Sequence, residues 1–447
     1  MQSIHGFDFF SLNFDGDGKL ISGEFEDCKR RAATATDAIF LAHGFRNDLN
    51  DATKLYTKFL DTFRAHLSRP EFSELSKRNF VVAGVFWPSK PLPETFHSDE
   101  GSAQATDDDA PQMAAVTKKL EDLKDVSPAK AAALDQAAAL LPSVKDDPAK
   151  QDKFASLVLS TLDGSQVDPT EGLDRIRQQD GSVMFQKLSG PIVLPTQRPD
   201  DSGGASTVGD VGTIGTSGGV ESFGSFFRSV LGGIDKFLNL TTWYVMKNRS
   251  GIVGATGVAQ AVRDLKASNN NIRLHLVGHS LGGRLIASCA KSLAKDPILQ
   301  PDSVTLLEAA FSHYGFSANN GKGTPGFFRD VIAKKVVKGP LLETFSYQDT
   351  VVGLTYAIAS HLADDNSEAI GDANDLFGGI GRNGAQKTAE SVAIKLKTPS
   401  SPGDPYAFNT GIVTCLDGSG GLIKDHSDVT NENVTYAFAA AVAATGV

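Results

Sequence analysis

Ser280 stands at the centre of the short sequence Gly278-His279-Ser280-Leu281-Gly282, in which two glycines flank a serine. The apolar residues before it predict a strand, and those after it recur at helical spacing. A serine held in strained dihedrals at such a corner needs neighbours without side chains, because the chain packs back on itself. The free amides of the following helix would stabilise negative charge that develops during acyl transfer. The pattern therefore predicts a nucleophilic serine rather than a glycine-rich turn, with Gly278, His279 and Gly282 at the border of the substrate.

The segment His43-Gly44-Phe45 follows another apolar run and offers the second group that acyl transfer needs. An oxyanion is held by two backbone N–H groups, one from the residue after the nucleophile and one from a loop after an early strand. Leu281 and Phe45 occupy those two positions, so we expect their N–H groups to form the oxyanion hole. Two roles stay open for His43, which either caps the loop or takes a direct part.

The general base is expected to be a histidine after the serine, and three residues qualify: His313, His361 and His426. His361 lies within a helical pattern, where a solvated or hydrogen-bonded histidine is the simpler interpretation. His313 follows a predicted strand and could approach the rim of the site. His426 lies between the last predicted strand and the last predicted helix, where a loop can bring imidazole to the serine hydroxyl. We therefore predict His426 as the base.

The acid that orients the base is expected between the serine and the histidine. Asp349 follows the predicted strand Leu341–Ser346 and is our candidate. Its alternative role is the N-cap of the next predicted helix. Asp425 and Asp428 are too close in sequence to His426 to reach its far nitrogen easily.

The segment Gly278–Gly283, together with His43-Gly44-Phe45, resembles the nucleophile elbow and oxyanion loop of α/β-hydrolases, in the branch of lipases and esterases. Thr242–Val262 also resembles the segment before the elbow in uncharacterised bacterial members. The order of the three site residues along the chain is that of the family: Ser280, Asp349, His426. The resemblance implies a mostly parallel eight-stranded sheet with an inserted cap. It also implies hydrolysis through an acyl-enzyme, without a metal or an organic cofactor.

The substrate class that this resemblance implies is a small ester or lipid-like molecule with an apolar portion. Amidase, peptidase or thioesterase activity through the same three residues stays open, because the leaving group is read by the shape of the pocket. Outside enzymes, the alternative is a non-catalytic α/β-hydrolase fold that serves as a binding protein. The intact set of serine, aspartate and histidine speaks against that alternative.

The elements that would position these residues alternate along the chain, which favours an α/β fold with a doubly wound, mostly parallel sheet. Several apolar runs are nearly continuous, as expected for strands buried on both faces. The predicted strands are Gly6–Phe14, Asp37–Ala42, Asn79–Phe86, Ile272–Val277, Ser303–Glu308, Leu341–Ser346 and Gly411–Cys415. The predicted helices are Asp51–Leu67, Gly254–Lys266, Leu281–Lys295, Pro325–Lys335 and Thr430–Ala444.

Residues 89–240 depart from this rhythm and predict a helical cap insertion, which leaves residues 1–88 and 241–447 as the hydrolase core. A stretch rich in glycine, serine and threonine near residues 200–219 predicts a flexible loop. After that loop, eight apolar residues share one stripe of a predicted helix, which serves either as core or as a roof over the site. They are Phe223, Phe226, Phe227, Val230, Leu231, Ile234, Phe237 and Leu238.

The segment Asn13–Glu24 matches the spacing of a calcium-binding EF-hand loop. An EF-hand needs a helix that enters the loop, whereas the residues before Asn13 alternate between apolar and polar. We therefore favour a β-hairpin with a turn at Asp15–Lys19.

The composition is that of a globular protein, since 40% of the 447 residues are hydrophobic and 21% are charged. A net charge of −10 argues against nucleic-acid partners and against attraction to anionic membranes. The three cysteines form no disulfide framework and fit a reducing compartment. Neither a signal peptide nor a membrane-spanning segment is visible, so we expect a cytoplasmic protein, with export by an unconventional route left open. Nothing in the sequence indicates an oligomeric state.

Overall fold

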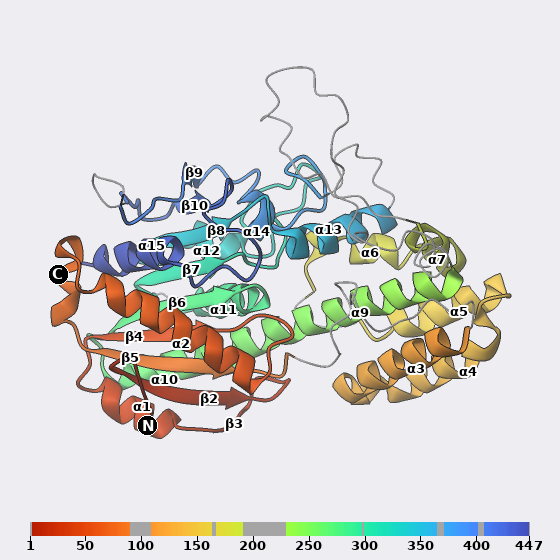
Figure 1. Ribbon diagram of the computed structural model, residues 1–447, viewed down its shortest axis with the longest axis horizontal. Coiled ribbons are helices and arrows are strands. Elements are labelled where there is room, and N and C mark those ends of the chain that lie inside the picture. Colours follow the sequence, from red (N-terminus) through yellow and green to blue (C-terminus); the bar gives the residue numbers. More distant parts are fainter. Residues whose placement is uncertain are drawn as a thin grey trace, which may run out of the picture. The chain divides into compact units, whose positions relative to one another are not determined.

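The computed structural model describes residues 2–89, 109–162, 167–190, 229–296, 299–363, 371–400 and 406–446. The chain divides into two units (Figure 1). The first comprises Met1–Ser89, Arg249–Val352 and Gly378–Val447, and the second comprises Lys90–Asn248 and Gly353–Phe377.

The first unit is built on a ten-stranded sheet with the order β1-β2-β5-β4-β6-β7-β8-β10-β9, and β3 pairs with β2. All pairings from β2 to β9 along this order are parallel, whereas β1 and β3 are antiparallel to β2. The predicted α/β class with a mostly parallel sheet is therefore confirmed. The sheet exceeds the eight strands that the resemblance implied, because two short antiparallel strands are added at β2. The strands are β1 Gln2–Ile4, β2 Phe7–Phe14, β3 Leu20–Gly23, β4 Asp37–Ala42, β5 Phe80–Phe86, β6 Arg273–His279, β7 Ser303–Leu307, β8 Leu341–Phe345, β9 Ser391–Lys395 and β10 Val413–Asp417.

Helices cover both faces of this sheet, and its central strands are therefore buried. Every residue of β4, β5, β7 and β8 is buried. Helices α2 (Leu49–His66) and α15 (Glu432–Ala443) pack side by side, with the rings of Phe59 and Phe438 5.3 Å apart (Figure 1). A second group contains α1 (Phe25–Ala32), α10 (Ala259–Ser268) and α11 (Leu281–Leu293), which contact one another in turn. The predicted helix Pro325–Lys335 shortens to α12 (Arg329–Ala333).

The N-terminal segment Asn13–Glu24 lies in a hairpin, as predicted. Strand β2 enters the loop and pairs with β3, so that Asn13 lies opposite Ser22. The Asp15 carboxylate accepts hydrogen bonds from the backbone N–H groups of Asp17 and Lys19, which closes the turn. The element that enters the loop is a strand, so this segment does not have the helix–loop–helix geometry of an EF-hand.

The second unit is helical among the residues that the structure describes. Its helices are α3 Asp109–Val126, α4 Ala131–Val144, α5 Pro148–Leu159, α6 Leu173–Ile176, α7 Gly181–Leu188, the first part of α9 Val230–Val253 and most of α13 Thr350–Leu362. Phe185 contacts both Phe154 and Phe237 edge to face and ties α5, α7 and α9 together. Gly233 permits this packing, because a Cβ there would lie 2.3 Å from the carbonyl oxygen of Phe185.

The predicted apolar stripe falls partly in α9. Leu231, Ile234, Phe237 and Leu238 are buried there, and the contact of Phe237 with Phe185 makes it part of the core of the second unit. The side chain of Val230 is half-buried. Phe223, Phe226 and Phe227 lie outside the described residues, as does the predicted loop near residues 200–219.

The second unit also contains a buried polar cluster. Lys247 forms an ion pair with Glu171 and donates a hydrogen bond to the hydroxyl of Tyr356, and both charged side chains are at most 3% exposed. Tyr356 donates to Glu171 over 2.9 Å, and the Lys247 ammonium lies 4.1 Å from the centre of the Trp243 ring. These contacts explain why residues 353–377 join the second unit, whereas the sequence analysis assigned them to the core.

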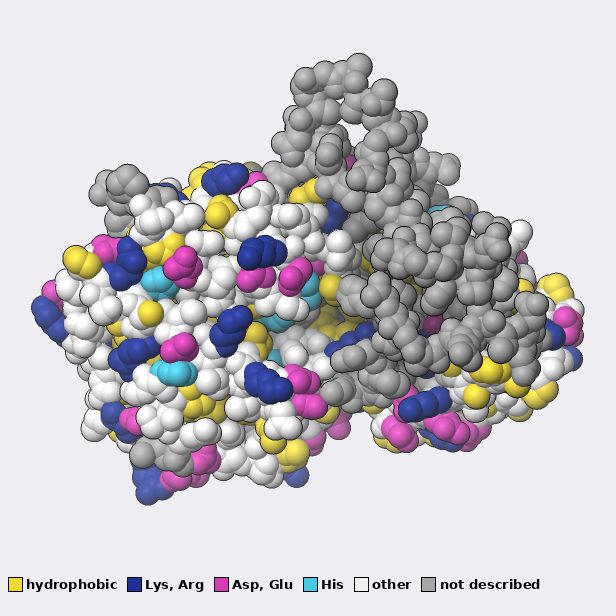
Figure 2. Space-filling view, viewed as in Figure 1, with side chains coloured by type: hydrophobic (Ala, Val, Ile, Leu, Met, Phe, Trp, Pro, Cys, Tyr) yellow, Lys and Arg dark blue, Asp and Glu magenta, His cyan; other side chains and the backbone are white. Residues whose placement is uncertain are grey.

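The two signs of charge are interspersed over the face seen in Figure 2, with lysine and arginine next to aspartate and glutamate. No helix among the described residues is long and apolar enough to cross a membrane.

Candidate active site

Ser280 sits at a sharp turn between β6 and α11, with φ 57° and ψ −124°. This backbone conformation is rare for a residue with a side chain and is found where the surrounding structure enforces it. Here the two flanking glycines permit the tight corner, because neither has a side chain. A Cβ on Gly278 would lie 2.2 Å from the carbonyl oxygen of Gly282, and one on Gly282 would lie 2.3 Å from that of Ala42. The strand-to-helix corner predicted from the glycine spacing is therefore present.

The loop after β4 lies against Ser280. Strands β4 and β6 are parallel neighbours, and Ala42 is opposite Gly278. A Cβ on Gly44 would come within 2.7 Å of the Cβ of Ser280, so the absence of a side chain at Gly44 permits this approach. Phe45 follows Gly44, and Leu281 is the first residue of α11. Strand β4 lies between β5, which follows it in the chain, and β6, which comes later. The strand order therefore reverses direction at β4, and ligands of open α/β sheets bind at such topological switch points.

His43 anchors this loop rather than presenting a free ring. Its Nδ1–H donates to the carbonyl of Gly44, and its Nε2 accepts from the backbone N–H of Trp87, whose ring stacks on the imidazole. The His43 backbone N–H donates to the hydroxyl of Tyr56, and the Trp87 indole N–H donates to the His43 carbonyl. Burial lowers the pKa of His43 to about 4, so the ring is neutral at pH 7. Of the two roles left open, the loop-holding one fits these contacts.

His426 and Asp349 form a buried pair in the first unit. His426 Nδ1–H donates to Asp349 Oδ2 over 2.7 Å, and the two residues are 9% and 0% exposed. Asp349 Oδ1 accepts from the backbone N–H of Val352, which caps the start of α13. The predicted pairing and the alternative capping role therefore coexist, one on each carboxylate oxygen. Arg382 donates to the backbone carbonyl of Asp349 and holds this turn.

His279 joins the elbow to the loop of His426. Its Nε2–H donates to the backbone carbonyl of His426 over 2.7 Å, and the two rings lie 4.7 Å apart. Burial, reinforced by the neighbouring His426, lowers the pKa of His279 to about 3. A neutral His279 therefore fixes the backbone of His426 to the residue that precedes Ser280, and Ser280 is 5% exposed.

The remaining candidates have other hydrogen-bond partners or belong to the other unit. His313 Nδ1 accepts from the side-chain amide of Asn383 over 3.2 Å, and His361 belongs to α13 in the second unit. Asp425 and Asp428 accept from backbone N–H groups two and four residues away, which is local turn chemistry.

Glu308 is a residue of this site that the sequence analysis missed. It follows β7 directly, with φ 45°, and is 0% exposed. One of its carboxylate oxygens and atoms of Asp349 and His426 all lie within 4.8 Å of one another. Burial first, and then the charge of Asp349, raise the pKa of Glu308 well above its ordinary value. We assign no metal to this group, because the Nδ1–H group of His426 already donates a hydrogen bond to Asp349 over 2.7 Å. The sequence signal was weak, since Glu308 appears only as the last residue of an apolar run.

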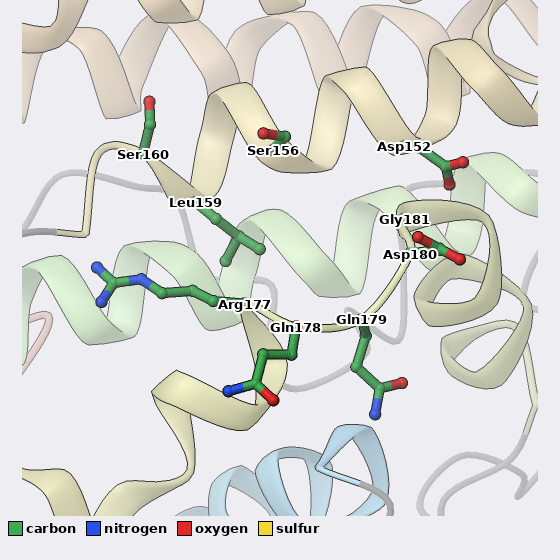
Figure 3. A pocket seen from close by; sticks show the side chains of 9 residues that line it. All are labelled: Asp152, Ser156, Leu159, Ser160, Arg177, Gln178, Gln179, Asp180 and Gly181. Carbon is green, nitrogen blue, oxygen red and sulfur yellow. The ribbon is translucent and has the colours of Figure 1, made fainter.

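A separate polar pocket belongs to the second unit alone (Figure 3). It lies between α5 and the segment that joins α6 to α7, and it contains none of the predicted site residues. Its lining residues are Asp152, Ser156, Leu159, Ser160, Arg177, Gln178, Gln179, Asp180 and Gly181.

Comparison of the chain with models of known protein families, with curated proteins and with solved structures found no match. Function in this chain is therefore to be inferred from the geometry of the site itself.

Proposed function

We propose that the protein is a serine hydrolase of the α/β-hydrolase type that cleaves carboxylic esters with an apolar portion. One observation carries the proposal: Ser280 occupies a strained strand-to-helix corner, with the Gly44 loop against it and the His426–Asp349 pair joined to it through His279. Strained residues of this kind cluster at functional sites. The eight consecutive parallel strands and the position at the topological switch point support the assignment.

The mechanism follows from the hydrogen bond between His426 and Asp349. Because Nδ1–H is engaged by the carboxylate, Nε2 is the nitrogen that takes the proton of Ser280 as its oxygen attacks the acyl carbon. The N–H groups of Phe45 and Leu281 hold the oxyanion. His426 then returns the proton to the leaving alcohol, and water releases the acyl group by the same route. In each step His426 is the group that takes up the proton and gives it back: from Ser280 to the leaving alcohol, and then from the attacking water to Ser280.

The ester preference is the less specific part of the proposal and comes from the resemblance of Gly278–Gly283 and His43-Gly44-Phe45 to lipases and esterases. Amides, peptides and thioesters use the same acyl-enzyme chemistry. A panel of p-nitrophenyl esters with graded acyl chains, run beside the matching anilides and thioesters, separates these classes.

Labelling with a fluorophosphonate probe tests the nucleophile. The wild-type protein should be labelled at Ser280, whereas Ser280→Ala should lose both labelling and turnover, the latter by about 10⁶-fold. Ser288→Ala is the matched control, because Ser288 is a buried serine of α11, the helix that Ser280 precedes, and its loss should leave labelling unchanged. Labelling at another serine, or none in a preparation that hydrolyses esters, would contradict the assignment of Ser280.

A further inference from the structure

Two carboxylates meet at the far side of His426, where a single acid would suffice for the proposed chemistry. Asp349 follows β8 and Glu308 follows β7, and these strands are parallel neighbours. A carboxylate oxygen of each lies within 4.8 Å of the other and of a His426 nitrogen, and both residues are 0% exposed. Two adjacent buried carboxylates are not both ionised, because their separation is short and burial removes the screening that water would provide.

The hydrogen bonds decide which of the two acids keeps its proton. Asp349 accepts from His426 Nδ1–H and from the backbone N–H of Val352, and both donors stabilise its anion. Neither oxygen of Glu308 has a hydrogen-bond donor at bonding geometry among the described residues. The anion therefore belongs on Asp349 and the proton on Glu308.

The other charged groups around Glu308 point the same way. Asp425 in the loop after β10 adds negative charge, which disfavours a further anion, and Glu343 on β8 is itself a buried acid whose pKa burial raises well above its ordinary value. Arg382 of α14 (Ile380–Asn383) donates to backbone carbonyls of Tyr347 and Asp349. The backbone of Glu308 is itself fixed, because its N–H donates to Thr344 and a Cβ on Gly381 would clash with its carbonyl carbon at 2.4 Å.

We propose that Glu308 is a neutral carboxylic acid that donates its proton to the Asp349 carboxylate, and that it acts as a positioning residue for the His426–Asp349 pair. The inference rests on the proposed function, since it concerns the same base. A neutral donor on Asp349 takes up part of the negative charge that would otherwise stabilise protonated His426. Glu308 thereby limits the negative charge that Asp349 presents to the His426 imidazole.

The pH dependence of fluorophosphonate labelling tests this role, because the labelling rate follows the unprotonated fraction of His426. Glu308→Gln keeps a neutral N–H donor toward Asp349, and its acid limb should stay within about 0.3 pH unit of the wild type. Glu308→Leu removes the donor, so His426 becomes more basic and the acid limb should move up by about one pH unit.

Three outcomes would overturn the proposal. If Glu308 is ionised in the wild type, both variants remove a negative charge and move the limb to lower pH. If its role is only structural, both variants slow labelling equally at every pH without moving the limb. If Glu308→Gln abolishes labelling while Asp349→Asn retains it, Glu308 is itself the acid that pairs with His426.

An infrared difference spectrum provides a readout that needs no activity. Wild type minus Glu308→Gln at pH 7 should show the C=O stretch of a protonated carboxyl group, whereas an ionised Glu308 gives only carboxylate bands. The buried acid Glu343 is common to both proteins and cancels. If Ser280 is not labelled but this band is present, the proposed function fails while the protonation of Glu308 stands.

Discussion

At the scale of single residues, the proposed chemistry depends on which imidazole ring is free to exchange a proton. Burial keeps His43 and His279 neutral. The ring N–H of His43 donates to the carbonyl of Gly44, and that of His279 donates to the carbonyl of His426. His426 differs, because one nitrogen is fixed by Asp349 and the other remains for chemistry.

Substitution of His426 and of its acid should separate these roles. We expect His426→Ala to lower turnover by about 10⁶-fold and Asp349→Asn by about 10⁴-fold, because the amide favours the wrong tautomer. His313→Ala is the matched control, since His313 is another buried histidine of the first unit but pairs with Asn383. It should lower the melting temperature and leave the fluorophosphonate labelling rate within about tenfold. Loss of labelling in His313→Ala alone would identify a different base.

The sequence was informative where residue type and local spacing coincide. The glycines around Ser280 predicted the corner because their lack of a side chain is a local steric requirement. Asp349 and His426 could be singled out because each follows the end of a predicted strand. Glu308 also ends a strand, but its meaning depends on β7 lying next to β8, and no local pattern shows which strands are neighbours.

At the scale of elements, the approach of the β4 loop to the elbow leaves no room for a side chain at Gly44. A methyl group on Gly44 would lie 2.7 Å from the Cβ of Ser280, so either the loop or the serine has to move. Gly44→Ala should therefore misplace the proposed Phe45 donor and slow fluorophosphonate labelling by about 10²–10³-fold.

The control for that substitution is Gly190→Ala, because the nearest atom to its new methyl group would be the Lys187 carbonyl oxygen at 3.4 Å. It should label at the wild-type rate. Overpacking at Gly44 is expected to cost about 1–3 kcal/mol, so the melting temperature of both variants is measured alongside the rate. Labelling of Gly44→Ala at the wild-type rate would remove the β4 loop from the proposed oxyanion hole.

The central strands could be predicted because burial on both faces leaves nearly continuous apolar runs, as in β4 and β5. Strands β1 and β9 were not predicted, because they lie at edges, are largely exposed and carry mixed residues. Backbone pairing forms them more than a hydrophobic pattern does. The predicted helix Pro325–Lys335 is shorter for a different reason. Pro325 and Gly326 begin the segment, and helical residues start only at Arg329.

At the scale of the whole molecule, the division into two units was only partly readable. The change of composition near residue 89 marks the start of the second unit closely. The return of residues 353–377 to that unit could not be predicted, because it rests on contacts such as Tyr356 with Glu171, 185 residues apart in sequence. Each unit contains one of the two tryptophans, Trp87 in the first and Trp243 in the second, which allows their stabilities to be followed separately.

Asp168 makes the stability of the second unit depend on pH. Burial, followed by the charge of Glu171, raises the pKa of Asp168 from its ordinary 3.8 to about 6. Between these values the folded chain holds a proton that the unfolded chain has released, so the folded state loses stability as the pH rises from about 4 to 6. The loss is constant above pH 6 and amounts to at most about 3 kcal/mol.

Replacement of Asp168 by asparagine should remove this loss. The amide oxygen can still accept from the backbone N–H and hydroxyl of Thr170, as Oδ1 of the aspartate does. In a Trp87→Phe background, urea unfolding followed by Trp243 fluorescence should find Asp168→Asn no more stable than its parent at pH 4 and more stable at pH 7, by up to about 3 kcal/mol. In a Trp243→Phe background, Trp87 should report no such difference for the first unit. A variant that is less stable than its parent at pH 7 would mean that the pKa of Asp168 is not raised in the folded chain, because Lys247 then stabilises the anion more than burial destabilises it.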